Sequence, residues 1–183
     1  MVVLYVLVGL VVVVGLFLVL QFNGLVRLRN RIESAWAQID VQLQRRYDLV
    51  PNLVETVKGY AAHEKQVLEN VTAARAEALN AKGVVEQAKA ETGFTAALKS
   101  LFAVSEAYPD LKANQNFLAL QEELSGTEGR IAYARQFYND MVQGYNNKVQ
   151  TFPGNVVAGV FRFTAREYFE ADAASRPPVK VQF

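Results

Sequence analysis

The sequence contains no cysteine, which excludes disulfide bonds, cysteine nucleophiles and cysteine-based zinc sites. It also lacks an excess of charge of either sign, because 19 Lys and Arg residues are balanced by 18 Asp and Glu residues. A nucleic-acid-binding domain usually carries a broad basic surface, so we expect no nucleic-acid partner. Proline and glycine are scarce, with five and eleven residues, and most lie at the boundaries between apolar patterns.

Recognised catalytic and cofactor motifs are absent. The single histidine, His63, is followed four residues later by Val67, where the zinc-protease pattern requires a second histidine. Neither G-x-x-x-x-G-K-[ST] nor G-x-G-x-x-G occurs. We therefore predict a non-enzyme with no catalytic residue, metal site or cofactor, in which His63 is a surface or internally satisfied residue. A hydrolase with an unfamiliar site is the open alternative, and its candidate carboxylates are Asp48, Glu64 and Glu128.

The chain starts with a long apolar run. The nineteen residues from Val2 to Leu20 carry no charge and no strong hydrogen-bonding side chain. As a helix rising about 1.5 Å per residue they cover roughly 29 Å, close to the thickness of a bilayer's hydrocarbon core. We predict a transmembrane anchor at residues 1–22, with Val2 and Phe22 at the ends of the span. A cleaved signal peptide is the main alternative, but the basic start, shorter run and small-x-small site that it requires are missing.

Three arginines follow the apolar run, at Arg27, Arg29 and Arg31, and no basic side chain precedes it. Basic residues next to a span stay on the cytoplasmic side of the membrane. We therefore predict that the N-terminus lies outside, that the body of the chain is cytoplasmic, and that the lipid bilayer is a partner.

After a short break at Asn23-Gly24, apolar residues recur every three or four positions, which predicts amphipathic helices. The first stripe could continue the apolar run as one long helix. Pro51 predicts a kink or a new first turn, because proline lacks a backbone donor and disfavours helical angles at the residue before it. The pattern then resumes up to about Asn80, or to Ala90, and is weakened at Lys82-Gly83. The first stripe consists of Leu25, Leu28, Ile32, Trp36, Ile39, Leu43 and Tyr47.

A turn is predicted at Glu91-Thr92-Gly93, followed by a shorter helix over residues 95–107 that ends at Pro109. The next helix has the most regular pattern of the chain, a heptad seam of about four heptads typical of coiled-coil packing. Gly126 and Gly129 lie within it and indicate the close approach of a neighbouring helix. The seam consists of Phe117, Leu120, Leu124, Thr127, Ile131, Ala134, Tyr138, Met141 and Tyr145.

Pro153-Gly154 ends this helix, and Asn155 is the predicted N-cap of a short apolar helix over residues 156–161. An aromatic cluster is expected to fold back on the end of the bundle; its members are Phe161, Phe163, Tyr168 and Phe169. Three tyrosines on apolar stripes are predicted to be core residues: Tyr60, Tyr138 and Tyr145.

These patterns predict an all-α fold, with an N-terminal transmembrane helix followed by an antiparallel bundle of three to four long helices and a short C-terminal helix. Amphipathic helices cannot bury their stripes alone, and short turns make consecutive helices antiparallel neighbours. We assign residues 1–22 to the anchor, 23–174 to the bundle and 175–183 to a C-terminal tail.

A polar run lies on the helix that follows the anchor. Solvated helix surface is the default interpretation of Arg45 and Arg46. The outward positions of the run are our candidates for lateral contacts with another protein. The run consists of Gln38, Asp40, Gln42, Arg45 and Arg46.

Several motifs of the chain resemble those of the LemA family of bacterial membrane proteins. They include NGLV, RNR, AWAQIDVQL, RRYDLVPNLV and VKGY in residues 23–60, and LKANQNF, LQEEL, YAR and FYND in residues 111–140. The likeness covers nearly the whole chain, anchor included, and is weakest at residues 81–108. It implies a single N-terminal span, a helical bundle and no established enzymatic activity, and it carries over no catalytic residue.

On these grounds we predict a non-enzymatic, single-pass scaffold in the bacterial cytoplasmic (inner) membrane. It would self-associate as a homo-oligomer or organise other membrane proteins of the envelope. The alternative is an accessory subunit that binds a membrane protease or another envelope enzyme.

Overall fold

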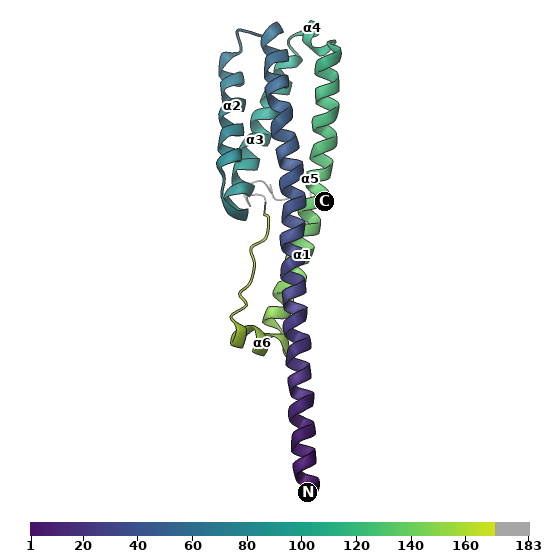
Figure 1. Ribbon diagram of the computed structural model, residues 1–183. Coiled ribbons are helices and arrows are strands. Elements are labelled where there is room, and N and C mark those ends of the chain that lie inside the picture. The colour runs from purple at the N-terminus through teal and green to yellow at the C-terminus, as the bar shows by residue number, and fades with distance from the viewer. Residues whose placement is uncertain (171–183) are drawn as a thin grey trace, which may run out of the picture. The chain divides into compact units, whose positions relative to one another are not determined.

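The computed structural model describes residues 1–170, and this range is helical apart from short connections and a final extended segment (Figure 1). The all-α prediction is confirmed, and residues 1–170 contain no strand. The predicted tail, residues 175–183, and the end of the predicted bundle lie outside the described residues. The helices are α1 (Val2–Tyr60), α2 (Lys65–Asn80), α3 (Gly83–Ser105), α4 (Pro109–Lys112), α5 (Gln115–Gln150) and α6 (Gly154–Phe161).

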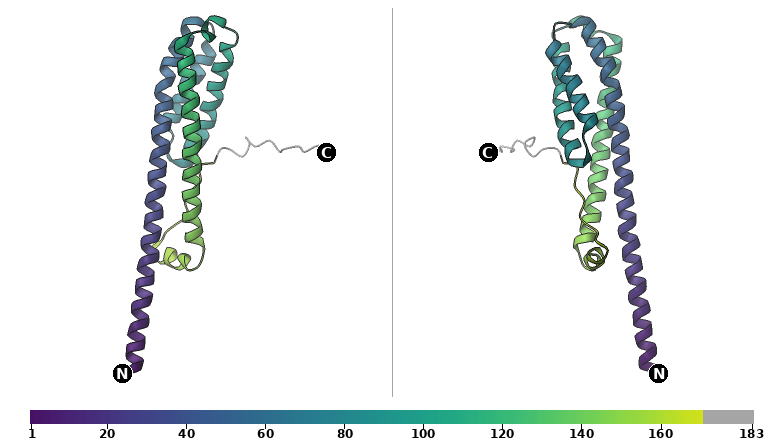
Figure 2. Two further views of the ribbon diagram at one scale, coloured as in Figure 1. Left: turned by 90° about the vertical axis from the view of Figure 1, so that its right-hand side faces the viewer. Right: turned by 60° about the vertical axis from the view of Figure 1, so that its left-hand side comes forward.

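The chain divides into two compact units, and among the described residues the larger one contains residues 38–135 and 168–170. Within it, the end of α1, then α2, α3 and the start of α5 run alternately up and down as an antiparallel bundle (Figures 1 and 2). Its core is the apolar stripe of each helix, as the periodicity predicts. Fully buried members include Leu43, Leu53, Val71, Phe94, Leu101, Phe117 and Ile131.

Helix α1 continues through Pro51, so the new first turn, one of the two predicted alternatives, is wrong. Proline removes the backbone bond to the carbonyl four residues earlier, which is that of Tyr47. Here Nε of Arg75, on α2, donates to this carbonyl at 2.7 Å. The freed acceptor is thereby satisfied, and the helix persists to Tyr60.

Two other boundaries differ from the prediction. The pattern after Pro51 is split between α1 and α2 by a connection at residues 61–64, where His63 is exposed. The predicted turn at residues 91–93 is wrong, because it lies inside α3 and Glu91 is buried. The chain instead turns before Gly83, whose φ of +80° suits glycine.

Helix α5 is confirmed over the predicted seam, most of which is buried. The explanation for Gly126 and Gly129 is wrong, because both are exposed. A Cβ at Gly129 would meet nothing within 4 Å, and one at Gly126 would meet only the side chain of Arg130. The prediction that three tyrosines are core residues is confirmed for Tyr138 and Tyr145, which are buried. It is wrong for Tyr60, whose side chain is 44% exposed.

The smaller unit contains residues 1–37 and 136–167, that is, the start of α1, the end of α5 and α6. Trp36 and Tyr138 pack edge to face, with ring centroids 5.7 Å apart. Beyond α6 the chain returns along α5, where the Asn146 side chain bonds to both the backbone N–H and the carbonyl of Arg166, at 2.8 and 2.9 Å. Helix α6 begins at Gly154, and Pro153 at its N-cap position makes no side-chain cap. The prediction of Asn155 as the N-cap is wrong, because Asn155 is the second residue of the helix.

The predicted aromatic cluster is divided between the two units. Phe161 and Phe163 belong to the smaller unit, where both rings contact Phe22. Tyr168 and Phe169 belong to the larger unit.

Candidate functional site

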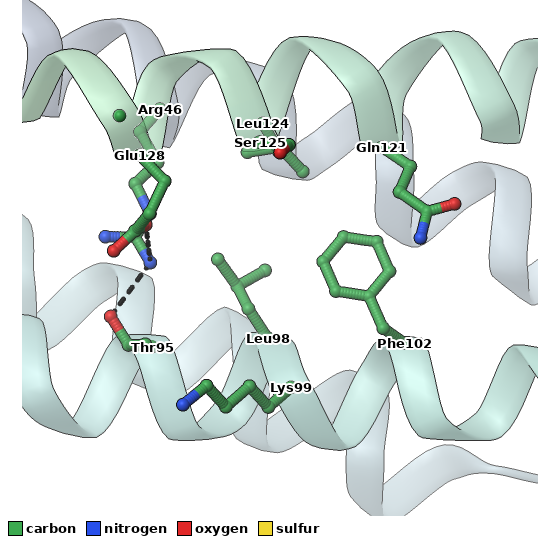
Figure 3. A pocket seen from close by; sticks show the side chains of 10 residues that line it. Arg46, Thr95, Leu98, Lys99, Phe102, Gln121, Leu124, Ser125 and Glu128 are labelled. Atoms are coloured by element: carbon green, nitrogen blue, oxygen red, sulfur yellow. Dashed lines mark hydrogen bonds and ion pairs between the residues drawn. The ribbon is translucent and has the colours of Figure 1, made fainter.

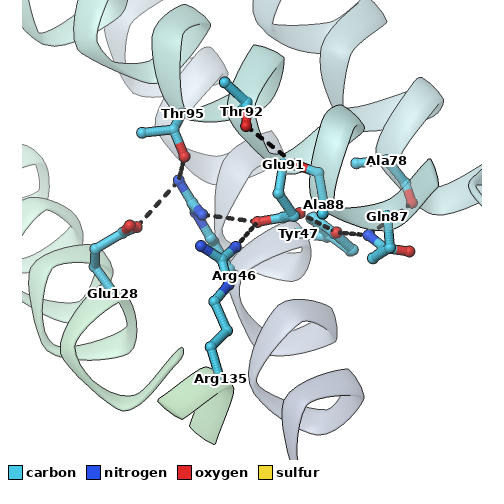
Figure 4. Close-up of polar contacts among 10 residues, drawn as sticks. All are labelled: Arg46, Tyr47, Ala78, Gln87, Ala88, Glu91, Thr92, Thr95, Glu128 and Arg135. Atoms are coloured by element: carbon cyan, nitrogen blue, oxygen red, sulfur yellow. Dashed lines mark hydrogen bonds and ion pairs between the residues drawn. The ribbon is translucent and has the colours of Figure 1, made fainter. Parts of the chain in front are cut away.

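A cluster of charged and polar side chains lies inside the larger unit (Figure 4). At its centre, Nη1 of Arg46 on α1 lies 2.9 Å from Oε2 of Glu91 on α3, and the two side chains are 2% and 1% exposed. Arg135 of α5 donates to the same oxygen at 3.3 Å. The hydroxyl of Tyr47 donates to the other oxygen, Oε1. The Glu91 carboxylate therefore accepts hydrogen bonds on both oxygens, from α1 and from α5.

The formal charges in this Arg46–Glu91 cluster are balanced. Nη2 of Arg46 lies 3.1 Å from a carboxylate oxygen of Glu128 on α5 and 2.9 Å from the hydroxyl of Thr95. The two positive charges of Arg46 and Arg135 are thus matched by the two negative charges of Glu91 and Glu128. Removing one partner of a buried pair typically costs about 3–5 kcal/mol, because an uncompensated charge is left behind. The cluster therefore holds α1, α3 and α5 in one arrangement.

Tyr47 extends the cluster through its hydroxyl, which accepts a hydrogen bond from Nε2 of Gln87 at 2.8 Å. Burial raises the pKa of Tyr47 well above its usual range, and the hydrogen bond to Glu91 raises it further. The phenol consequently remains a neutral donor. Burial also lowers the pKa of Arg135 from its usual value, while the charges of Glu91 and Glu128 counteract that effect.

The geometry of Glu91 suits a structural role. A general base needs a carboxylate oxygen within reach of a substrate proton. Both oxygens of Glu91 are already bonded, and the side chain is sealed inside the bundle. Glu128, one of the hydrolase candidates, is about half exposed but pairs with Arg46.

The other two candidate carboxylates take part in unrelated contacts. Asp48 accepts a hydrogen bond from Gln44 on the same helix at 2.8 Å, and Glu64 accepts one from the Tyr108 hydroxyl at 3.2 Å. Across residues 1–170, no group of three or more His, Cys, Asp or Glu side chains is placed to hold a metal ion.

A groove of about 520 Å³ opens beside the cluster, between α3 and α5 (Figure 3). Leu98 and Phe102 of α3 and Leu124 of α5 form its apolar walls. Arg46 and Glu128 form its charged end. The groove therefore combines apolar walls with a charged end.

The predicted interaction residues do not form one surface. Arg45 pairs with Glu123 of α5 at 2.9 Å, and both side chains are 47% exposed. Arg46 is buried in the cluster, so its interpretation as solvated surface is wrong. Of the other members of the run, Gln38 and Asp40 are exposed and Gln42 is half-buried.

The predicted anchor residues separate into a free and a packed part. Residues 1–20 are exposed throughout, and α1 is the one helix in the described chain long and apolar enough to cross a membrane. Phe22 is half-buried against Phe161 and Phe163. The guanidinium of Arg29 lies 6.0 Å from the centre of the Phe163 ring, whereas Arg27 and Arg31 are exposed.

Sequence reasoning missed Glu91 as the buried partner of Arg46, and it missed Tyr47 and Arg135 as further donors to Glu91. A signal for Glu91 was present, because it lies in register with a stripe of α3. With Glu91 included, the stripe reads Gln87, Glu91, Phe94, Leu98 and Leu101, and all five residues are buried.

Comparison with known proteins places this architecture in a family. A model of the LemA family matches residues 35–183. The chain belongs to the LemA family. Protein LemA of Metamycoplasma hominis is 29% identical, over 86% of this chain and 72% of that protein. Magnetosome protein MamQ 2 of Paramagnetospirillum magneticum is 27% identical, and Magnetosome protein MamQ of Magnetospirillum gryphiswaldense is 26% identical, each over 88% of this chain and 69% of the relative.

The match to the LemA family includes the Arg46–Glu91 cluster and α6, since both lie after residue 35. It begins beyond the apolar part of α1. The names of the LemA and MamQ relatives state no enzymatic activity.

Proposed function

We propose that this LemA-family chain is a non-enzymatic, membrane-anchored helical scaffold that self-associates or organises other membrane proteins. The observation that carries the proposal is the start of α1, an apolar segment whose residues are all exposed. Residues 2–20 include sixteen Val, Leu and Phe residues. At about 0.3–0.6 kcal/mol each, their insertion into a bilayer is favourable by roughly 5 kcal/mol or more.

The charges next to this segment support a cytoplasmic bundle. Arg27, Arg29 and Arg31 follow the span on α1, and no Lys or Arg precedes it. We therefore place the anchor in a bacterial cytoplasmic membrane with the N-terminus outside. Lys82 is exposed and tests the orientation: a membrane-impermeant amine reagent should leave it unmodified in intact cells and modify it after lysis. Modification in intact cells would contradict this topology.

The bundle supports a scaffold because the charged groups buried in it bond to one another. The Arg46–Glu91 cluster links three helices and presents no free carboxylate to a substrate. The exposed positions Gln38 and Asp40 remain available for lateral contacts.

Self-association is tested by counting subunits of the full chain in lipid. Because the sequence has no cysteine, Val85→Cys at an exposed position of α3 provides one labelling site. Single-molecule photobleaching in vesicles should show two or more steps per spot at high protein-to-lipid ratio. Asp40→Arg should lower the step number, whereas the matched control Asp110→Arg, at an exposed position of α4, should not. Single steps at every ratio would contradict self-association.

The alternative is an accessory subunit that binds a membrane protease or another envelope enzyme. The groove between α3 and α5 favours it, because a partner segment could contact Phe102 while pairing with Lys99 and Glu128. Purification from native membranes with Ser125→Arg, at an exposed position of the groove, distinguishes the two functions. Loss of a stoichiometric partner on this substitution would support the accessory role, and assembly of the chain alone would support the scaffold.

A further inference from the structure

Helix α6 is apolar on both of its sides. Its eight residues carry no charge, and Asn155 is their one polar side chain. Val157 and Ala158 are buried, whereas Val156 and Val160 are 53% and 71% exposed. Val156 and Val160 are four residues apart and so lie on one side of the helix. A helix that is apolar all round needs apolar surroundings on its second side as well.

The exposed apolar surface begins before α6 and reaches the last residue of the helix. Phe152, two residues before the helix, is 81% exposed, and Phe161 at its end is about half exposed. Contiguous exposed apolar side chains mark an interaction surface, whereas scattered ones do not. We name this surface the α6 apolar face, and it consists of Phe152, Val156, Val160 and Phe161.

The α6 apolar face lies where the free part of α1 begins. The ring centroid of Phe161 is 4.8 Å from that of Phe22, which comes two residues after the end of the apolar run at Leu20. On the side of the smaller unit that faces the N-terminus, α1 alone continues past α6 (Figures 1 and 2). If residues 2–20 fill the hydrocarbon core, the face is level with the boundary between acyl chains and headgroups.

Basic side chains accompany this surface. The smaller unit holds six basic and three acidic residues, a net charge of +3 in a chain whose total is +1. Juxtamembrane cations are attracted to anionic lipid headgroups. The six basic residues are Arg27, Arg29, Arg31, Lys148, Arg162 and Arg166.

We propose that the α6 apolar face is a second membrane contact, inserted at the headgroup boundary of the bilayer that α1 crosses. Helices of this kind bury their apolar side about 5–10 Å into that boundary. The proposal rests on the anchor of the proposed function and adds a lipid-binding surface to it. With α1 and α6 both held, the smaller unit has a fixed orientation at the membrane instead of pivoting on one helix.

The test uses three single-cysteine variants of the full chain in vesicles, each labelled with an environment-sensitive fluorophore. Val160→Cys reports on the α6 apolar face. Ala37→Cys is the aqueous control, at an exposed position of the same unit. It lies fifteen residues, or about 22 Å, beyond Phe22 along α1. Val11→Cys, in the middle of the apolar run, reports on the anchor itself.

Quenching by aqueous iodide and by spin-labelled lipid is measured for each label. We expect iodide to quench the label at position 160 at least threefold less than the label at position 37. Lipid labelled near the headgroup should quench position 160, and lipid labelled deep in the acyl chain should quench position 11. Val156→Cys should repeat the result at position 160.

Three outcomes would overturn the proposal, and they are distinguishable. Equal iodide access at positions 160 and 37, with position 11 protected, would refute the α6 contact and leave the anchor intact. Iodide access at position 11 would refute the anchor and, with it, the proposed function. Protection at position 160 without quenching by lipid would show that protein, such as a second copy of this chain, covers the α6 apolar face.

Discussion

The substitution Glu91→Gln tests the Arg46–Glu91 cluster most sharply, because it changes the charge and almost nothing of the shape. It leaves two guanidinium groups with one half-exposed carboxylate, that of Glu128. Glu91 pairs with Arg46 at 2.9 Å and with Arg135 at 3.3 Å in a buried site. Charge-assisted hydrogen bonds contribute about 1.5–3 kcal/mol each, and breaking a buried pair costs about 3–5 kcal/mol. We therefore expect a loss of about 3–5 kcal/mol of unfolding free energy.

The matched control is Glu123→Gln. It makes the same change in an ion pair of the same length, Arg45–Glu123 at 2.9 Å, whose side chains are 47% exposed. Exposed pairs contribute about 0–1 kcal/mol, so the control should change stability by no more than that.

The assay is urea unfolding of the full chain in vesicles, followed by the loss of helical circular dichroism. With a slope of about 2 kcal/mol per molar urea, Glu91→Gln should lower the midpoint by roughly 1.5–2.5 M, and the control by less than about 0.5 M. Equal shifts for the two variants would refute the argument that burial makes this cluster matter.

Three further predictions concern other contacts. Because the pKa of Tyr47 is raised in the folded chain, the unfolded chain loses the phenolic proton near pH 10 while the folded chain keeps it. The unfolding free energy should therefore fall as the pH rises above about 10, by up to 1.4 kcal/mol per pH unit for this group. Tyr47→Phe should make this fall shallower in urea titrations at pH 9–11, and an unchanged slope would contradict the assignment. Arg75→Met should lower the unfolding free energy by about 1–3 kcal/mol, because it leaves the Tyr47 carbonyl without its donor. In a Pro51→Ala background the backbone N–H of residue 51 can donate to this carbonyl, so the loss should be smaller. Gly154→Ala should lower the unfolding free energy by about 1–3 kcal/mol, because the new Cβ would overlap the backbone carbonyl of Lys148. The control Gly159→Ala, whose Cβ would meet nothing within 4 Å, should be neutral or stabilising. Unfolding of both variants is followed through Trp36 fluorescence.

Regular repetition made part of the fold predictable. The seam of α5 keeps its three- and four-residue steps from Phe117 to Tyr145, and that helix was placed correctly. The break between α1 and α2 was not visible, because Leu53, Val57, Leu68 and Val71 continue the apolar pattern across it. The spacing of apolar residues shows which side of a helix is buried. It does not show a short turn after which the apolar residues continue at the same three- and four-residue spacing.

The errors at Pro51 and Glu91 have a common physical origin. Each residue breaks a local rule, and each is satisfied by a partner distant in sequence. Arg75 fills the hydrogen bond that Pro51 removes, and Arg46 and Arg135 neutralise Glu91 inside the bundle. Local propensity cannot contain such partners, because they arise only when the helices pack together. The candidate cluster was invisible for the same reason, apart from the register of Glu91 on its stripe.

The most direct test of the central claim, that residues 2–20 remain attached as an anchor, is a quantitative peptide measurement on alkaline-washed membranes. Trypsin cleavage after Arg27 should release a peptide carrying the whole apolar run. We expect this peptide to be recovered from the washed membranes in equimolar amount with peptides of the bundle. Bundle peptides found in the soluble fraction without it would contradict the account.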